Sequence, residues 1–206
     1  MKLFLASGNP HKVGEFQSLA DASGLRVEIV SAAAVGGMPA VVEDAGTFEG
    51  NARKKALALR TRLPAEAWAL ADDSGLCVDA LGGAPGVESA YYAGPQGDSA
   101  ANLEKLVEAM REAPDAQRGS HFMCVLVLAG PGGEFIFEGR CDGQLLQAPR
   151  GEGGFGYDPL FVPEGYTQSF SELGSEIKNR LSHRARAWEK LAEWLRESAK
   201  SVVNTA

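Results

Sequence analysis

The sequence predicts an α/β fold built on a mixed β-sheet flanked by helices. In the first half of the chain, short apolar runs such as 2–6 and 25–30 alternate with helical patterns, which favours strands joined by helices. In the second half, the β-rich runs 122–129 and 134–141 are separated only by the Gly-Pro-Gly-Gly segment 130–133, which predicts a hairpin. Two consecutive strands with no helix between them make the sheet mixed.

Length and charge limit the class of protein. The 206 residues suffice for one large domain or two small lobes around a buried core. With 20 Lys and Arg against 27 Asp and Glu, the net charge of -7 disfavours a nucleic-acid-binding protein, which needs a basic surface. A small polyanion still fits a local basic pocket.

The cysteines, the histidines and the lengths of the apolar runs indicate the cellular compartment of the protein and the kind of metal ion that it could bind. Cys77, Cys124 and Cys141 form no Cys-x-x-Cys pair and lie in apolar, strand-like stretches, so we expect core thiols in a reduced, cytoplasmic compartment. The 3 histidines lack zinc-site spacing, so any metal should be a hard ion bound by oxygen. The apolar run 3–6 is too short for a signal peptide, and no run is long enough for a membrane span, so we expect a soluble, untargeted protein.

The loop Ser7-Gly8-Asn9-Pro10-His11-Lys12 should lead into the first helix. Asn9 suits the N-cap and Pro10 the first helical position. Lys12 then lies in the first turn, where the helix dipole disfavours a cation by about 0.3 to 1 kcal/mol. A phosphate held by Lys12 and the backbone N–H groups would compensate for this, and an ordinary capped helix with a solvated lysine fits the same residues.

A second helix should begin after the N-cap Thr47 and end before Pro64. Its core face repeats at helical spacing: Ala52, Ala56, Leu59 and Leu63. Thr47, Asn51 and Lys55 form a separate polar stripe that is able to line a pocket. The neighbouring basic residues 53–54 also suit a stripe that simply faces solvent.

Two adjacent acids, Asp72 and Asp73, follow the buried strand predicted over 68–71. Successive side chains of a strand point to opposite faces, so both acids reach one pocket only if the strand breaks there. Gly75 permits such a break, and we expect a separate strand over 76–80. Because Asp, Ser and Gly are common turn residues, a plain strand-to-turn transition is the competing interpretation.

A helix over 99–113, capped by Asp98 or Ser99, has an apolar face and is interpreted as structural.

The glycine-rich segment 151–156 formally matches Gly-x-Gly-x-x-Gly, but an apolar run follows it in place of the helix that a dinucleotide fingerprint requires. Its glycines allow close approach to a flat ligand beside Phe155 and Tyr157, and a tight turn with packed aromatic rings fits equally.

The last helical pattern runs over 175–198, with a core face formed by Leu181, Ala185, Trp188, Leu191 and Leu195. On one continuous helix, Lys178 and His183 lie roughly 140 degrees apart. A break capped by Ser182 would bring Lys178, His183 and Arg184 to one side. A single long helix with solvated charges is the alternative.

Together these stretches are similar to the Ham1 family of inosine triphosphate pyrophosphatases, from Ser7 to the final helix. Five motifs occur in the family's order: Ser7-Gly8-Asn9-x-x-Lys12; Glu43 with Thr47-Phe48-x-x-Asn51-Ala52-x-x-Lys55-Ala56; Ala71-Asp72-Asp73-Ser74-Gly75-Leu76; Gly153-Gly154-Phe155-Gly156-Tyr157-Asp158-Pro159; and Ser182-His183-Arg184 after Lys178. One departure is Tyr91, in Ser89-Ala90-Tyr91-Tyr92, where bacterial members often have arginine, which puts that arginine's contact in doubt.

The resemblance implies one elongated domain over 1–206, with two lobes around a central cleft, that forms a homodimer. It implies Mg²⁺-dependent hydrolysis of noncanonical purine triphosphates (ITP, dITP and XTP) to the monophosphate and pyrophosphate, which cleans the nucleotide pool. Asp73 would be the catalytic base, and Glu43 and Asp73 would hold Mg²⁺. The implied substrate-binding residues are Ser7, Gly8, Asn9, Pro10, His11, Lys12, Asn51, Lys55, Ser74, Phe155, Gly156, Tyr157, Asp158, Lys178, His183 and Arg184.

Two other functions remain open at this point. A Maf-type enzyme would hydrolyse modified pyrimidine triphosphates on a similar fold, and a nucleotide-binding module would bind ITP without releasing pyrophosphate. The set of Asp73, Glu43 and Lys55 argues against a binding module, because binding alone does not need a carboxylate beside a metal. A haloacid-dehalogenase-like phosphatase is excluded, since its mechanism needs Asp-x-Asp and the two acids here are adjacent.

Overall fold

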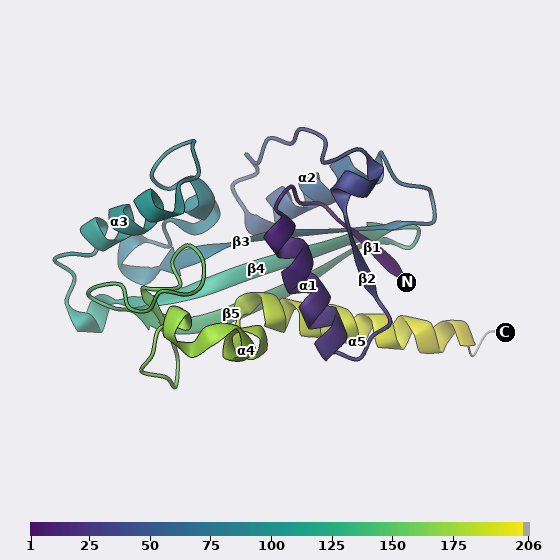
Figure 1. The fold of residues 1–206 in the computed structure, drawn as a ribbon. Helices are drawn as coiled ribbons and strands as arrows, with labels where there is room; N and C mark the ends of the chain where they lie inside the picture. The colour runs from purple at the N-terminus through teal and green to yellow at the C-terminus, as the bar shows by residue number, and fades with distance from the viewer. Residues whose placement is uncertain (204–206) are drawn as a thin grey trace. The chain divides into compact units, whose positions relative to one another are not determined.

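A computed structural model describes residues 1–203 and confirms the mixed α/β fold (Figure 1). Its strands are β1 (Lys2–Leu5), β2 (Glu28–Ser31), β3 (Trp68–Val78), β4 (Gly119–Gly130), β5 (Gly133–Leu145) and β6 (Phe161–Pro163). Its helices of more than two turns are α1 (Pro10–Ala22), α2 (Phe48–Arg60), α3 (Ser99–Ala109), α4 (Phe170–Leu181) and α5 (His183–Val203). The described strands form one sheet in the order β2-β1-β3-β4-β5-β6. β1 pairs in parallel with β2 and β3, whereas β5 and β6 are antiparallel.

The chain divides into two compact units. Unit 1 contains Met1–Asp73, Val125–Glu138 and the described chain from Ala187 onward, and unit 2 contains Ser74–Cys124 and Gly139–Arg186. The long strands β3, β4 and β5 each contribute residues to both units. In β3 the change of unit falls between Asp73 and Ser74.

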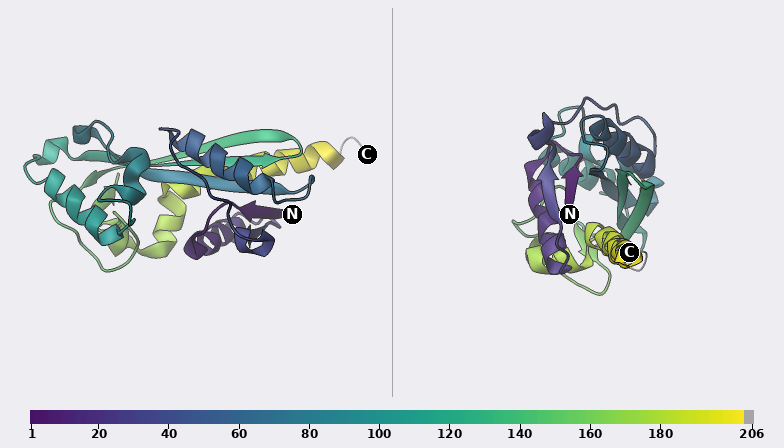
Figure 2. Two further views of the ribbon diagram at one scale, coloured as in Figure 1. Left: turned by 90° about the horizontal axis from the view of Figure 1, so that it is seen from above. Right: turned by 90° about the vertical axis from the view of Figure 1, so that its right-hand side faces the viewer.

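In unit 1, helices cover both faces of the strands (Figure 2). Ala52, Ala56 and Leu59 of α2 pack with Ala69 and Ala71 of β3 in one buried cluster. The opposite side carries α1 and the unit's part of α5, which meet where the rings of Phe16 and Trp188 lie 6.0 Å apart. Because side chains alternate along β3, Asp73 shares the α2 face with Ala69 and Ala71, and Asp72 points to the α1 face.

Unit 2 has its own buried core. Phe122 of β4 lies at its centre and packs edge-on against Phe161 with ring centroids 4.8 Å apart. Arg118 is also buried, and its guanidinium donates to four main-chain carbonyls: Met110, Ala113, Leu145 and Leu146. These bonds tie the end of α3 to the end of β5. They also satisfy helix carbonyls that have no partner within the helix.

The predicted strand break at Gly75 is wrong. β3 runs without interruption from Trp68 to Val78, so no separate strand begins at Leu76. The strand lies between β1 and β4, and pairing on both edges outweighs the turn tendency of Asp-Ser-Gly. Gly75 serves close packing instead, because a Cβ there would lie 2.2 Å from the carbonyl oxygen of Gly86 and 2.5 Å from the Ser89 hydroxyl.

Helix starts agree better with the sequence than helix ends. Asn9, Thr47 and Asp98 each cap a helix with the side chain, as predicted. α2 and α3 end before the predicted Leu63 and Ala113, and α4 begins at Phe170, five residues before the predicted start. Of the two alternatives at Ser182, the structure shows the break and not the single long helix: the ψ of Ser182 is 157° and its hydroxyl accepts from the Ala185 N–H.

Two further expectations concern cysteines and membranes. Cys124 and Cys141 are buried, and burial raises the pKa of Cys141 to about 11, whereas Cys77 is half-buried. Across residues 1–203, we find no helical segment with the length and apolar character that crossing a membrane requires.

Candidate active site

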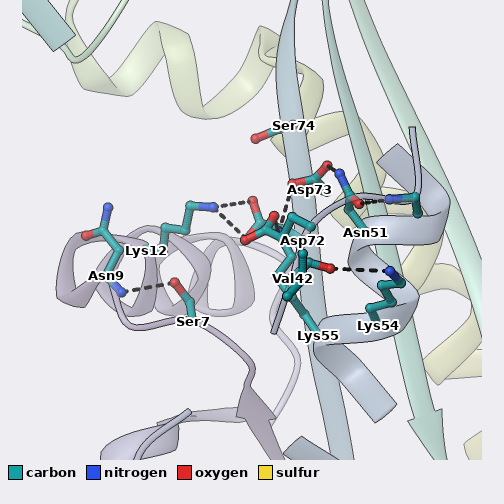
Figure 3. Close-up of polar contacts among 12 residues, drawn as sticks. Ser7, Asn9, Lys12, Val42, Asn51, Lys54, Lys55, Asp72, Asp73 and Ser74 are labelled. Atoms are coloured by element: carbon teal, nitrogen blue, oxygen red, sulfur yellow. Dashed lines mark hydrogen bonds and ion pairs between the residues drawn. The ribbon is translucent and has the colours of Figure 1, made fainter. Parts of the chain in front are cut away.

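Asp72 is the partner of the lysine in the first turn of α1. Both carboxylate oxygens of Asp72 accept from Lys12 Nζ, at 2.9 and 3.0 Å (Figure 3). The Asp72 side chain is 0% exposed and that of Lys12 is 26% exposed. The anion that offsets the unfavourable helix dipole at Lys12 is therefore a protein carboxylate, whereas the sequence suggested a phosphate or solvent.

Asp73 is held on the other face of β3 by two side chains of α2. Lys55 Nζ lies 2.8 Å from Asp73 Oδ1, and Asn51 Nδ2 lies 3.3 Å from Asp73 Oδ2 (Figure 3). The same Lys55 ammonium donates to Glu43 Oε2 at 2.9 Å. Asn51 Oδ1 also accepts from the Ala45 N–H, at 3.0 Å, which fixes the loop before α2. The polar stripe of α2 thus lies against a buried carboxylate and does not simply face solvent.

Carboxylates and ammonium groups lie close together in this group. Three carboxylates, Glu43, Asp72 and Asp73, are paired with two ammonium groups, Lys12 and Lys55. Burial raises the pKa of Asp73, Lys55 lowers it, and Glu43 and Asp72 raise it, so that it lies above its ordinary value. Burial alone would lower the pKa of Lys55, but its attraction to Asp73 and Asp72 and its hydrogen bonds raise it overall. Burial is thus the main cause of the raised pKa of Asp73, whereas neighbouring carboxylates raise the pKa of Lys55 against the effect of burial.

A pocket of about 200 Å³ opens beside these residues within unit 1. Its lining includes Ser7, Gly8, Lys12, Glu43, Lys55 and Asp72. The N-terminal loop is shaped by its own hydrogen bonds: Ser7 Oγ accepts from the Asn9 N–H at 3.1 Å, and Asn9 Oδ1 accepts from the His11 N–H at 2.9 Å. His11 is exposed, and Pro10 is the first residue of α1.

Glu43 and Asp73 offer hard oxygen donors. Mg²⁺ is commonly held by one or two carboxylates, with waters and substrate phosphates completing its six ligands. Within residues 1–203, no group of three or more His, Cys, Asp or Glu is arranged as a metal cage. The donor type fits a divalent ion whose remaining ligands come from water and substrate.

Asp158 organises the glycine-rich loop of unit 2. It is 2% exposed, and its Oδ2 accepts from the Phe155 N–H at 2.7 Å and from Lys178 Nζ at 2.5 Å. At Gly154, whose φ is 84°, a Cβ would lie 2.5 Å from Asp158 Oδ2, so the loop closes around this carboxylate only with glycine there. The Phe155 ring is 71% exposed as a result, which leaves it free to stack on a flat ligand.

Tyr157 connects this loop to the start of unit 2. Its buried hydroxyl donates to the Ser89 carbonyl oxygen at 2.8 Å, and the Ser89 hydroxyl accepts from the Leu76 N–H at 2.9 Å. Asn102 of α3 donates to the Ala90 carbonyl oxygen at 2.9 Å. Sequence reasoning missed both residues as members of this network: Asn102 lies in no recognised motif, and Ser89 was noted only as part of Ser89-Ala90-Tyr91-Tyr92.

The break at Ser182 directs three side chains to different partners in unit 2. Lys178 contacts Asp158, and Arg184 Nη2 lies 2.9 Å from Ser74 Oγ. The His183 ring stacks on Phe122, with centroids 4.8 Å apart and planes 11° from parallel. Tyr91, which stands where bacterial members of the family often have arginine, is 52% exposed.

The predicted residues therefore fall into two sets. Unit 1 contains Ser7, Gly8, Asn9, Pro10, His11, Lys12, Glu43, Asn51, Lys55 and Asp73. Unit 2 contains Ser74, Phe155, Gly156, Tyr157, Asp158, Lys178, His183 and Arg184. The role of Asp72 escaped sequence reasoning, although a lysine in a first helical turn that contains no acidic residue signals that a counter-ion is needed.

Comparison with known proteins identifies the family. The model of the Ham1 family matches residues 3–194. The chain belongs to the Ham1 family. A protein of Opitutus terrae named dITP/XTP pyrophosphatase is 64% identical over 203 residues, covering 96% of this chain and 100% of the relative. A protein of Streptomyces coelicolor with the same name is 46% identical over 199 residues, covering 95% of this chain and 98% of the relative.

Solved structures of Ham1 proteins share the fold. The Ham1 protein of Staphylococcus aureus superposes with a TM-score of 0.85 at 32% identity, covering 96% of this chain and 100% of that structure. A HAM1 protein from Coxiella burnetii gives a TM-score of 0.83 at 35% identity, with coverage of 96% and 99%. The mixed sheet and its helices are thus those of this family.

Proposed function

We propose that this Ham1 protein hydrolyses noncanonical purine nucleoside triphosphates, dITP, XTP and ITP, to the monophosphate and pyrophosphate. The observation that carries the proposal is the buried Asp73, fixed by Lys55 and Asn51 and sharing its lysine with Glu43. The names of the relatives from Opitutus terrae and Streptomyces coelicolor support the choice of substrate.

The phosphates are assigned to unit 1. Lys12, Lys55 and the backbone of Ser7 to Asn9 would bind phosphate oxygens, since ammonium groups and a helix N-terminus both favour anions. Glu43 and Asp73 would hold Mg²⁺, which would supply charge neutralisation and Lewis acidity when bound. Asp73 would orient the attacking water and accept its proton, and Ser74 would contact the nucleotide.

The base is assigned to unit 2. Phe155, held outward by Asp158, would stack on the purine, with Gly156 and Tyr157 shaping the loop. Lys178, His183 and Arg184 would offer donors to a 6-oxo group. Adenine presents a 6-amino donor to such a pocket and leaves buried groups unpaired, so ATP would be rejected.

The cellular setting belongs to the same proposal. The whole chain would act as one Ham1-type domain, with the two units as its lobes. It would form a homodimer in the cytoplasm, where it would remove noncanonical nucleotides from the nucleotide pool. No nucleic acid or membrane partner is part of the proposal. Sedimentation equilibrium of the purified chain tests the homodimer, which a monomer mass would contradict.

A substrate panel tests the activity. We expect release of pyrophosphate from dITP, XTP and ITP with Mg²⁺ at least about 100-fold faster than from dATP or ATP, because one unpaired buried donor costs about 1 to 3 kcal/mol. Guanine carries the same 6-oxo group, so discrimination against dGTP and GTP requires that its 2-amino group meet no acceptor in the pocket. Preference for modified pyrimidine triphosphates would favour a Maf-type enzyme. Tight dITP binding with no pyrophosphate release would favour a binding module.

A further inference from the structure

Lys55 occupies the position between the two carboxylates that are assigned to the metal. Its Nζ is 2.9 Å from Glu43 Oε2 and 2.8 Å from Asp73 Oδ1, and its side chain is 11% exposed. A Mg²⁺ ion bound to the same two oxygens, at about 2.0 to 2.1 Å from each, would lie within roughly 4 Å of this ammonium. Repulsion between these cations at that distance is strong in a partly buried site.

The third carboxylate of this group, Asp72, does not offer the Lys55 ammonium a replacement partner. Asp72 already binds Lys12 through both of its oxygens. Binding of a divalent ion by Glu43 and Asp73 therefore leaves the Lys55 ammonium without its two charge-assisted hydrogen bonds. The pocket lined by Lys55 also contains Ser7, Gly8 and Lys12, the groups assigned to phosphate. A triphosphate there would give the displaced ammonium a new anionic partner, within reach of its flexible stem.

We propose that Lys55 makes divalent-ion binding conditional on the nucleotide, because its ammonium competes for Glu43 and Asp73 until a triphosphate draws it away. This inference rests on the proposed function, since it uses the same metal ligands. Its consequence is coupling: metal and triphosphate each raise the affinity for the other, by the same factor. Lys55 is thus both a phosphate ligand and a positioning residue for the metal.

Direct Mn²⁺ binding to the purified protein, followed by electron paramagnetic resonance, tests this coupling. Without nucleotide, Lys55→Gln should bind Mn²⁺ about tenfold more tightly than wild type, because two charge-assisted hydrogen bonds no longer have to be broken. With a saturating α,β-imido analogue of dITP, Mn²⁺ affinity should rise in both proteins, because phosphate oxygens add ligands, and the gain should be about tenfold larger for wild type than for Lys55→Gln.

Three matched variants define the result. Lys54→Gln removes the adjacent exposed lysine, which pairs with Asp44, and should leave Mn²⁺ affinity unchanged. Lys55→Arg keeps the competing charge and should stay close to wild type. Lys55→Met retains an apolar stem and should behave as Lys55→Gln does, which provides a second folded variant.

Two outcomes overturn the inference. One is a Lys55→Gln or Lys55→Met protein, folded by its melting curve, that binds Mn²⁺ no more tightly than wild type. The other is a wild type whose Mn²⁺ affinity does not respond to the analogue. Hydrolysis of dITP by the wild type is measured separately, so that failure of the proposed function and failure of the coupling are distinguishable.

Discussion

The acidic pocket of unit 1 and the glycine-rich loop of unit 2 both contain a buried aspartate bonded to a lysine, but the neighbours of the two aspartates differ. In the loop, Asp158 accepts from Lys178 and from the Phe155 backbone N–H. In the pocket, Asp73 shares Lys55 with Glu43, and burial, Glu43 and Asp72 raise the pKa of Asp73. The Asp158 contacts fix a loop, whereas two carboxylates that share one lysine are suited to receive a further cation.

The largest expected effect is on turnover. Asp73→Asn removes the proposed base and should lower kcat for dITP about 1000-fold, within the usual contribution of a general base. Because the pKa of Asp73 lies above its ordinary value of 3.8, the ionised carboxylate opposes folding once the pH exceeds that raised pKa. The variant should therefore melt no lower than wild type at pH 7. Wild-type turnover in a folded Asp73→Asn protein would remove Asp73 from the mechanism.

Asp158→Ala should instead reduce stability. It leaves the Lys178 ammonium and the Phe155 N–H without their shared acceptor, and breaking a buried pair in this way costs about 3 kcal/mol. Urea unfolding measures the loss. An unchanged midpoint would show that Asp158 does not hold the loop.

The substitution Phe155→Ala tests the role of the ring in binding without disturbing the fold of the loop, because Phe155 is 71% exposed. Loss of one stacking contact should raise KM for dITP about tenfold, because base stacking contributes about 1 to 3 kcal/mol. Its melting temperature should match wild type. An unchanged KM would remove the ring from base binding.

Tyr157→Phe should give the smallest effect. The variant keeps the ring and loses only the hydroxyl that donates to the Ser89 carbonyl oxygen, so the free energy of unfolding should fall by about 1 kcal/mol. Equilibrium unfolding in urea measures it. Tyr166 is 38% exposed, so Tyr166→Phe is the matched control and should leave the free energy of unfolding unchanged.

The parts that the sequence predicted are those set by local chemistry. Asn9, Thr47 and Asp98 cap helices because their side chains bond backbone groups two or three residues away. The hairpin and the break at Ser182 are local in the same way. The unbroken β3 was missed because its neighbours in the sheet come from distant parts of the chain. The Lys12–Asp72 pair joins residues 60 positions apart, a separation that periodicity does not reveal.

Metal binding by a matched pair of variants tests the contrast between the two aspartates most directly. Asp73→Asn and Asp158→Asn each remove one buried, lysine-paired carboxylate by the same chemical change. We would measure Mn²⁺ bound per chain with the α,β-imido analogue of dITP at saturation. The assignment of Glu43 and Asp73 as the metal ligands predicts that Asp158→Asn still binds Mn²⁺ with wild-type affinity and that Asp73→Asn binds it far more weakly. Equal Mn²⁺ binding by the two variants would contradict the assignment of the acidic pocket as the cation site.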